Sequence, residues 1–153
     1  MIEKFPYHEQ EKSYTCGAAS MRMALEHLGI KKTEQQVAKL LGTSKVRGTW
    51  EKDFPKIAEK YRLSYVVKHN GSIRDLKRLY KKEYVIIVCY HPGDEIDHYS
   101  IIRSIGEEKI HLYDPWYGKH GGPDETYKVS YFDKIWRTQQ EKDIRWLIAI
   151  KRL

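Results

Sequence analysis

The chain has 153 residues, of which 41% are hydrophobic and 32% charged, and its formal net charge is +7. This length predicts one domain spanning residues 1–153, and twelve Tyr with four Trp exclude a disordered chain. No apolar run reaches the roughly 18 residues of a membrane helix, and the N-terminus lacks the apolar region of a signal peptide. Because Cys16 and Cys89 are the only cysteines, a disulfide scaffold is not expected and a cytoplasmic protein is predicted.

The first part of the chain is predicted to be helical. Apolar residues recur at helical spacing from Gly17 to Leu28. Thr33 and Gln36 form a capping-box pattern before a second helix, which Gly42 ends. A third helix is expected over about Trp50 to Tyr61.

A strand over Leu63–Lys68 is expected next, followed by a helix that begins at Ser72 and Asp75. The spacing of five basic residues places them on one side of this helix: Arg74, Lys77, Arg78, Lys81 and Lys82. No nucleic-acid motif accompanies them, so we expect a solvated helix face and no nucleic-acid partner.

The remainder of the chain is predicted to form strands, of which Tyr84–Tyr90 is continuously apolar and therefore central. His98–Ile105 and Lys109–Pro115 flank a turn and are expected to form a hairpin. Further elements are a strand over Thr126–Val129, a short helix capped by Ser130, and a strand over Ile144–Ile150. Helices first and antiparallel strands afterwards predict an α+β fold.

Cys16 is the candidate nucleophile. It stands directly before Gly17-Ala18-Ala19-Ser20, at the start of the first predicted helix. Unpaired amide groups and the helix dipole favour negative charge there, which raises the thiolate fraction of a cysteine. Its position alone also fits an inert buried cysteine. Cys89 lies inside an apolar strand and is predicted to be a buried small residue.

His98 and Asp114 are predicted to lie on one face of the hairpin. If Ser100 pairs with Asp114, His98 faces Trp116, and Asp114 is a diagonal neighbour roughly 7–8 Å away at the backbone. We expect that face to pack against the first helix, which would bring Cys16 to His98. The expected face carries His98, Ser100, Ile102, Ser104, Ile110, Leu112, Asp114 and Trp116. The opposite face is expected to carry Tyr99, Ile101, Arg103, Ile105, Lys109, His111 and Tyr113.

In this arrangement His98 takes the thiol proton and later protonates the leaving group, while Asp114 holds the imidazole in one tautomer. Taken singly, these residues fit a strand histidine and a turn aspartate equally well. Gln10 precedes Cys16 by six residues. Its side-chain amide is placed to donate a hydrogen bond to an oxyanion beside the Cys16 N–H, although a surface glutamine in a polar loop is the alternative.

Four short motifs, in order, resemble the C39 family of cysteine peptidases. They are Gln10, Thr15-Cys16-Gly17-Ala18-Ala19-Ser20-Met21, Asp97-His98-Tyr99-Ser100-Ile101-Ile102, and Tyr113-Asp114-Pro115. Thr15 and Asp97 differ from the Asp and Gly that the family often has at these positions. The resemblance implies a papain-like fold in which N-terminal helices pack on a C-terminal antiparallel sheet. It also implies Cys16 as nucleophile, His98 as base, Asp114 as its orienting residue and Gln10 as oxyanion donor.

The resemblance implies a thiol peptidase or amidase that acts on peptide-like substrates and needs no cofactor. One alternative is acyl or peptidyl transfer, as in transglutaminases, which use the same Cys-His-Asp order and differ only in the second nucleophile. Another is a C39-like domain that binds peptides without turnover. No metal is predicted, because no zinc motif fits the spacing of His91, Asp94, Asp97 and His98.

Overall fold

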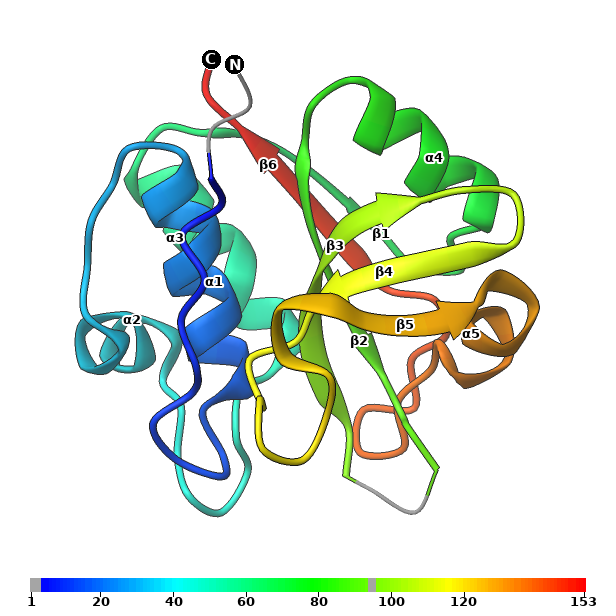
Figure 1. The fold of residues 1–153 in the computed structure, drawn as a ribbon. Helices are drawn as coiled ribbons and strands as arrows, with labels where there is room; N and C mark the ends of the chain where they lie inside the picture. The colour runs from blue at the N-terminus through cyan, green and yellow to red at the C-terminus, as the bar shows by residue number, and fades with distance from the viewer. Residues whose placement is uncertain (1–3, 94–95) are drawn as a thin grey trace.

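In the computed structural model, residues 4–93 and 96–153 are described, and they form a curved six-stranded antiparallel sheet with helices on both faces (Figure 1). The helices are α1 (Cys16–His27), α2 (Glu34–Leu41), η1 (Glu51–Asp53), α3 (Phe54–Lys60), α4 (Ile73–Lys81), η2 (Gly122–Asp124) and α5 (Val129–Ile135). The strands, in their order across the sheet, are β1 (Ser64–Lys68), β6 (Leu147–Lys151), β2 (Val85–Tyr90), β3 (His98–Ile105), β4 (Lys109–Tyr113) and β5 (Glu125–Lys128). Within these described ranges, no helix is both long and apolar enough to cross a membrane.

Local sequence signals set the ends of two helices as predicted. At α2, Thr33 Oγ1 accepts the Gln36 N–H, and Gln36 Oε1 accepts the Thr33 N–H. Gly42 ends this helix with a φ of 68°, a left-handed conformation that favours glycine. Ser72 and Asp75 form the same reciprocal pair at the start of α4.

The start of α5 differs from the prediction. The helix begins at Val129, and its N-cap Lys128 makes no side-chain capping bond, so Ser130 is not the cap. The Val129 N–H instead donates to the Glu108 carbonyl, 2.8 Å away in the β3–β4 turn. A tertiary contact therefore fixes this helix start, and a local capping pattern cannot reveal it.

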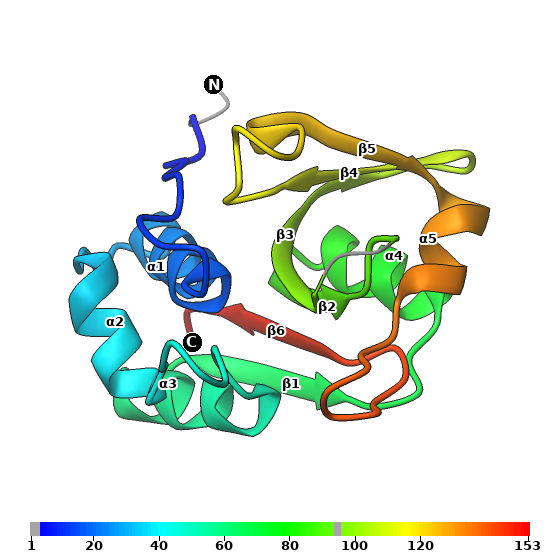
Figure 2. The ribbon, with the colours of Figure 1, turned by 90° about the horizontal axis from the view of Figure 1, so that it is seen from below.

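The sheet separates two apolar cores, because its central strands are buried on both faces. Figure 2 shows the sheet curving around α4 and α5, with α1, α2 and α3 on the other face. The core under α1–α3 takes the strand residues Val85, Ile87, Cys89, Tyr99, Ile101, Ile148 and Ile150. The core under α4 and α5 takes Ile86, Val88, Tyr90, Ile102, Ile110, Leu112, Leu147 and Ala149.

The β3–β4 hairpin has the predicted register at the end that matters for the site. Ile101 pairs with Tyr113 and Ile102 with Leu112, the register in which Ser100 would face Asp114. A bulge further along β3 shifts the pairing by one residue. Ile105 was expected on the face of Ile101, but the extra residue turns it toward the core under α4 and α5.

The predicted packing of the first helix on this hairpin is wrong. The side chains of α1 share a core with Tyr99, Ile101 and Tyr113, whereas Ile102 and Leu112 pack with α4 and α5. Both faces of β3 carry apolar residues, so the alternation of polar and apolar positions does not show which helices cover which face.

The basic residues of α4 lie mostly on its exposed side, as predicted. Arg78 pairs with Asp75 at 3.1 Å within the helix, and Lys77 pairs with Glu107 at 3.3 Å. The Lys77–Glu107 pair is exposed, and exposed ion pairs contribute little to stability.

Candidate active site

Cys16 is the first residue of α1, and it is 7% exposed. The Thr15 side chain does not cap the helix; its Oγ1 donates to the Lys12 carbonyl at 2.9 Å and accepts the Lys12 N–H at 3.0 Å. The Thr15 side chain therefore accepts no hydrogen bond from the first-turn N–H groups beside Cys16. Gly17 permits close packing here, because a Cβ at this position would lie 2.8 Å from Thr49 Cβ.

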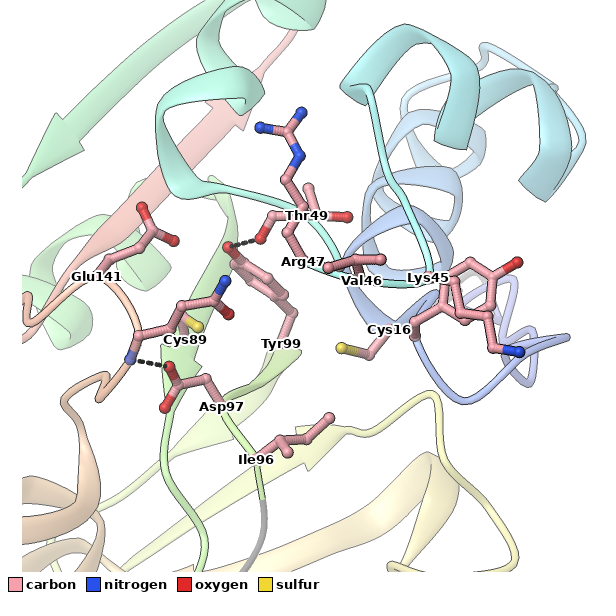
Figure 3. A pocket seen from close by; sticks show the side chains of 13 residues that line it. Cys16, Lys45, Val46, Arg47, Thr49, Cys89, Ile96, Asp97, Tyr99 and Glu141 are labelled. Carbon is pink, nitrogen blue, oxygen red and sulfur yellow. Dashed lines mark hydrogen bonds between the residues drawn. The ribbon is translucent and has the colours of Figure 1, made fainter.

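The Cys16 sulfur points into a cavity of about 150 Å³ between the α1 start and the sheet (Figure 3). Residues 45–49 form one wall, and the start of β3 with residues 140–141 forms the other. Val46 and Ile96 are apolar residues on these walls and are 97% and 62% exposed. The Tyr99 hydroxyl donates to the Thr49 carbonyl at 2.7 Å, which joins the two walls at the base.

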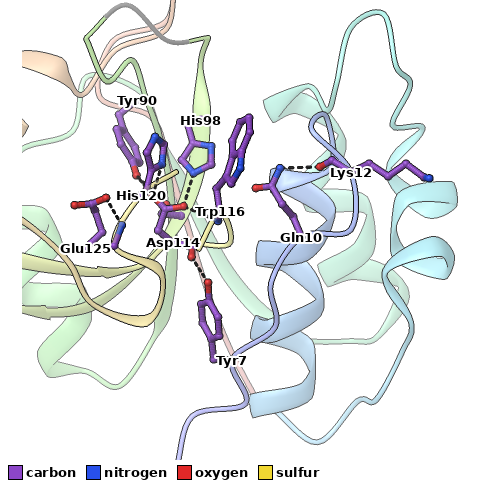
Figure 4. Close-up of polar contacts among 11 residues, drawn as sticks. Tyr7, Gln10, Lys12, Tyr90, His98, Asp114, Trp116, His120 and Glu125 are labelled. Atoms are coloured by element: carbon purple, nitrogen blue, oxygen red, sulfur yellow. Dashed lines mark hydrogen bonds and ion pairs between the residues drawn. The ribbon is translucent and has the colours of Figure 1, made fainter. Parts of the chain in front are cut away.

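His98 and Asp114, which the register predicts to be neighbours, are in direct contact. His98 opens β3 and Asp114 directly follows β4. His98 Nε2 is 2.7 Å from Asp114 Oδ1, and the two residues are 2% and 0% exposed (Figure 4). Burial of both groups excludes water from this hydrogen bond. The Trp116 ring lies beside the pair, 6.3 Å from the His98 ring centroid.

The two groups interact electrostatically with each other and with Cys16. Burial lowers the pKa of His98, but the charge of Cys16 and the hydrogen bond with Asp114 outweigh this and raise the pKa to about 10. Burial raises the pKa of Asp114, but hydrogen bonds with His120 and His98 outweigh burial and lower it to about 2. At neutral pH the site therefore holds a cationic ring next to a carboxylate, within reach of the Cys16 sulfur.

The surroundings of Asp114 include groups that no sequence motif indicates. The carboxylate accepts four hydrogen bonds, from His98 Nε2, Trp116 N, His120 Nδ1 and the Tyr90 hydroxyl. The Tyr7 hydroxyl also donates to the Asp114 carbonyl. His120 comes from the loop after β4, and no spacing pattern in the sequence links it to Asp114.

Among the described residues, His98, Asp114 and His120 place potential metal ligands close together. The N···O distances, however, are 2.7 Å for His98 and 2.8 Å for His120, as in direct N–H···O bonds. An ion bound at about 2.0–2.2 Å from each atom would hold nitrogen and oxygen further apart. The geometry fits hydrogen bonding. Of the metal candidates weighed in the sequence, Asp94 lies outside the described residues.

Gln10 lies in the segment before α1, beside Trp116 (Figure 4). Its backbone N–H donates to the Pro115 carbonyl at 2.8 Å, which ties it to the turn that carries Asp114. Its Nε2 donates to the Lys12 carbonyl at 2.7 Å and uses one of two amide hydrogens. The Thr15 hydroxyl donates to the same Lys12 carbonyl. Thr15, which departs from the family pattern, therefore helps to fix the carbonyl to which the Gln10 side chain bonds.

Asp97, the other departure from the family pattern, fixes one wall of the cavity. Its carboxylate accepts the N–H groups of Gln139 at 2.9 Å and Gln140 at 2.8 Å, and its Oδ1 is 3.0 Å from His91 Nδ1. These bonds hold the 139–141 segment against the start of β3. Asp97 therefore shapes the cavity opposite Cys16.

Glu51 is a buried acid behind this wall that no sequence feature marked. It is 3% exposed, and its N–H donates to Glu141 Oε1 at 3.1 Å. Burial, a side-chain hydrogen bond with Asp143 and the charge of Glu141 raise the pKa of Glu51 to about 10. Glu51 is therefore protonated at neutral pH.

Glu51→Gln is expected to stabilise the protein increasingly as the pH rises. Because folding raises the Glu51 pKa from 4.5 to about 10, its contribution to stability is full below pH 4.5 and is lost as the pH rises toward 10. Gln cannot titrate, so the variant should gain on the order of 1–3 kcal/mol over the parent at pH 8 and little at pH 4. Urea unfolding at both pH values measures this gain. Glu107→Gln, at a site 93% exposed, is the control, and an equal gain at both pH values would contradict the expectation.

The family model described as Peptidase_C39 like family matches residues 2–144. The chain belongs to the Peptidase C39-like family. A relative from Methanothermobacter thermautotrophicus, named an uncharacterized protein, is 32% identical over 126 residues, which are 82% of this chain and 79% of the relative. The family expected from the four motifs is therefore confirmed.

Solved structures confirm the fold of this C39-like chain. The peptidase domain of Streptococcus ComA, a bifunctional ABC transporter of a quorum-sensing pathway, superposes with a TM-score of 0.76 at 17% identity, covering 98% of this chain and 100% of that domain. A double glycine motif protease from an AMS/PCAT transporter, solved with its leader peptide, gives a TM-score of 0.71 at 18% identity, covering 98% and 93%. The predicted helices packed on an antiparallel sheet correspond to the C39 peptidase fold.

Proposed function

We propose that this C39-like protein is a cysteine peptidase in which Cys16 is the nucleophile, His98 the base, Asp114 the orienting residue and Gln10 an oxyanion donor. The observation that carries the proposal is the buried His98–Asp114 pair, 2.7 Å apart, whose cationic ring interacts with Cys16. A cation beside a thiol at a helix start favours the thiolate, which is the reactive nucleophile.

The proposed reaction has two stages. The Cys16 thiolate attacks the scissile carbonyl carbon, and the developing oxyanion accepts hydrogen bonds from the Cys16 N–H and Gln10 Nε2. The oxyanion collapses as the C–N bond breaks and His98 protonates the leaving amine, which leaves a thioester on Cys16. His98 then removes a proton from a water molecule that attacks the thioester, and the acid product and thiol are released. Asp114 stabilises the imidazolium throughout.

Peptides are the proposed substrates. A double glycine motif protease with the same fold was solved with a leader peptide. The cavity beside Cys16 is small, with a volume of about 150 Å³. The exposed apolar side chains of Val46 and Ile96 on its two walls suit contact with an extended peptide. Both cysteines are free, which suits the cytoplasmic compartment expected from the sequence.

The same residues would also serve acyl or peptidyl transfer, or peptide binding without turnover. The burial of the His98–Asp114 pair favours turnover over binding alone. A domain that only binds peptides has no need to bury an ionised pair, whose desolvation is costly. Transfer and hydrolysis share the thioester and differ in whether water or an amine attacks it. Product analysis in the presence of added amines distinguishes the two.

An electrophilic peptide probe is expected to label Cys16 and spare Cys89, and iodoacetamide should alkylate Cys16 much faster at pH 6–7. Cys89 is 1% exposed, and burial raises the pKa of its thiol well above the usual range. The two cysteines line the same cavity, so each is the matched control for the other. Mass spectrometry of the labelled peptides gives both rates. Equal rates, or faster labelling of Cys89, would refute Cys16 as the nucleophile.

A further inference from the structure

His120 lies between β4 and η2, outside the four motifs that carry the family resemblance. Its Nδ1 is 2.8 Å from Asp114 Oδ2, the oxygen that does not face His98. The His120 side chain is 11% exposed, and its ring stands at 85° to the His98 ring with the centroids 4.8 Å apart (Figure 4). Asp114 is therefore held between two imidazole rings.

The loop is folded so that His120 returns to Asp114. The His120 N–H donates to the Trp116 carbonyl at 2.9 Å, and the Asp114 N–H donates to the Gly122 carbonyl at 2.7 Å. Gly122 has a φ of +61°, and a Cβ there would lie 2.8 Å from the Tyr117 ring. The backbone of this loop thus carries His120 to the carboxylate through contacts that do not involve the imidazole ring.

We propose that His120 is a positioning residue for the catalytic pair: its Nδ1–H holds Asp114 Oδ2 and keeps Oδ1 aligned with His98 Nε2. This inference rests on the proposed function of Cys16 and His98. Asp114 has no solvent exposure, so only protein groups can donate to its charge. On Oδ2 the Tyr90 hydroxyl is more distant, at 3.3 Å, and is also 2.8 Å from Ser100 Oγ. His120 is accordingly the shorter of these two contacts on Oδ2, while the Trp116 N–H and His98 bind Oδ1.

Loss of this contact should weaken the support that Asp114 gives to the His98 imidazolium. Among the described residues, the other titratable groups around the pair include Cys16, which interacts with His98, Tyr90 and Tyr7, which contact Asp114, and Glu125, which accepts the Gly121 N–H. Lys119 lies over the Trp116 ring, 4.7 Å from its centroid. Of Tyr90, Tyr7 and Glu125, only Tyr90 donates to Asp114 Oδ2, at 3.3 Å, which is longer than the 2.8 Å contact of His120. A less stabilised imidazolium favours the Cys16 thiolate less, so the thiolate should form at higher pH.

Two substitutions separate the donor from the ring. His120→Asn places Nδ2 near the position of the imidazole Nδ1 and keeps the donor, whereas His120→Phe keeps a ring without a donor. The control is His111→Phe, because His111 Nδ1 makes a similar 2.8 Å contact with Asp124 Oδ1 outside the site. The readout is the rate of Cys16 alkylation by iodoacetamide between pH 4 and 10, which needs no substrate.

His120→Phe is expected to move the midpoint of the alkylation profile to higher pH by about one unit, which is the scale of one hydrogen bond to a charged group. His120→Asn and His111→Phe should stay within about 0.3 units of the parent. A His120→Phe profile that coincides with that of the parent would overturn the proposal.

The parent protein provides a second measurement if His120→Phe does not fold. In ¹⁵N NMR spectra at neutral pH, His120 Nδ1 must carry a proton, and an unprotonated Nδ1 would overturn the proposed donor. Failure of the peptidase proposal itself has a different signature. If the peptidase proposal fails, Cys16 of the parent does not react with the peptide probe. If only the His120 proposal fails, the parent reacts with the probe and His120→Phe has the alkylation profile of the parent.

Discussion

Cys16→Ala is expected to lower kcat for peptide cleavage by about 10⁴–10⁶-fold, because the thioester cannot form without the sulfur. Cys16 is 7% exposed at the start of α1, and its replacement by Ala removes one atom from the cavity wall. Peptide binding should therefore persist. A peptide substrate found by library screening, assayed for cleavage and for binding, measures both quantities.

Cys89→Ala is the matched control, because Cys89 lines the same cavity and is also buried. Its loss should lower stability by about 1 kcal/mol through a small cavity and change kcat little. Cleavage that persists in Cys16→Ala would reject the proposed mechanism. A parent that binds peptide tightly without turnover would show that this C39-like domain is a binding module.

Gln10→Ala is expected to lower kcat by about 10²–10³-fold with little change in KM. The proposed oxyanion appears only in the transition state, so the amide of Gln10 should contribute little to substrate binding. One amide hydrogen of Gln10 bonds to the Lys12 carbonyl, so the second amide hydrogen is the one that would serve the proposed oxyanion. The fold should persist, because the backbone N–H of Gln10 keeps its bond to the Pro115 carbonyl.

Gln140→Ala is the control for Gln10, because Gln140 lines the cavity on the wall opposite Cys16. It should change KM more than kcat, since it lines the proposed peptide-binding cavity away from the proposed oxyanion. Gln10→Glu adds a further comparison, because a carboxylate there repels an oxyanion and should reduce kcat at least as much as Ala does. A Gln10→Ala enzyme with unchanged kcat would remove Gln10 from the mechanism.

The sequence by itself determined the features that depend on local pattern. The capping pairs at Thr33 and Ser72 fix helix starts through contacts three residues apart, so they are visible without a fold. The contact of His98 with Asp114 followed from the predicted register of the hairpin. That register depends only on two consecutive strands and the short turn between them. The order of the four motifs sufficed to identify the C39-like family, which the family model confirms over residues 2–144.

Only the tertiary structure decided which groups meet across long stretches of chain. The central strands are apolar on both faces, so alternation could not show that α1 packs on the face of Tyr99 and not on that of Ile102. The bulge in β3 changes the facing of Ile105 and has no strong signal in the sequence. Glu51 and His120 have ordinary surface-type side chains in the sequence. Burial and contact with Asp143 raise the pKa of Glu51, and the contact with Asp114 brings His120 into the site. Neither effect is visible in the sequence, because the fold supplies the neighbouring groups.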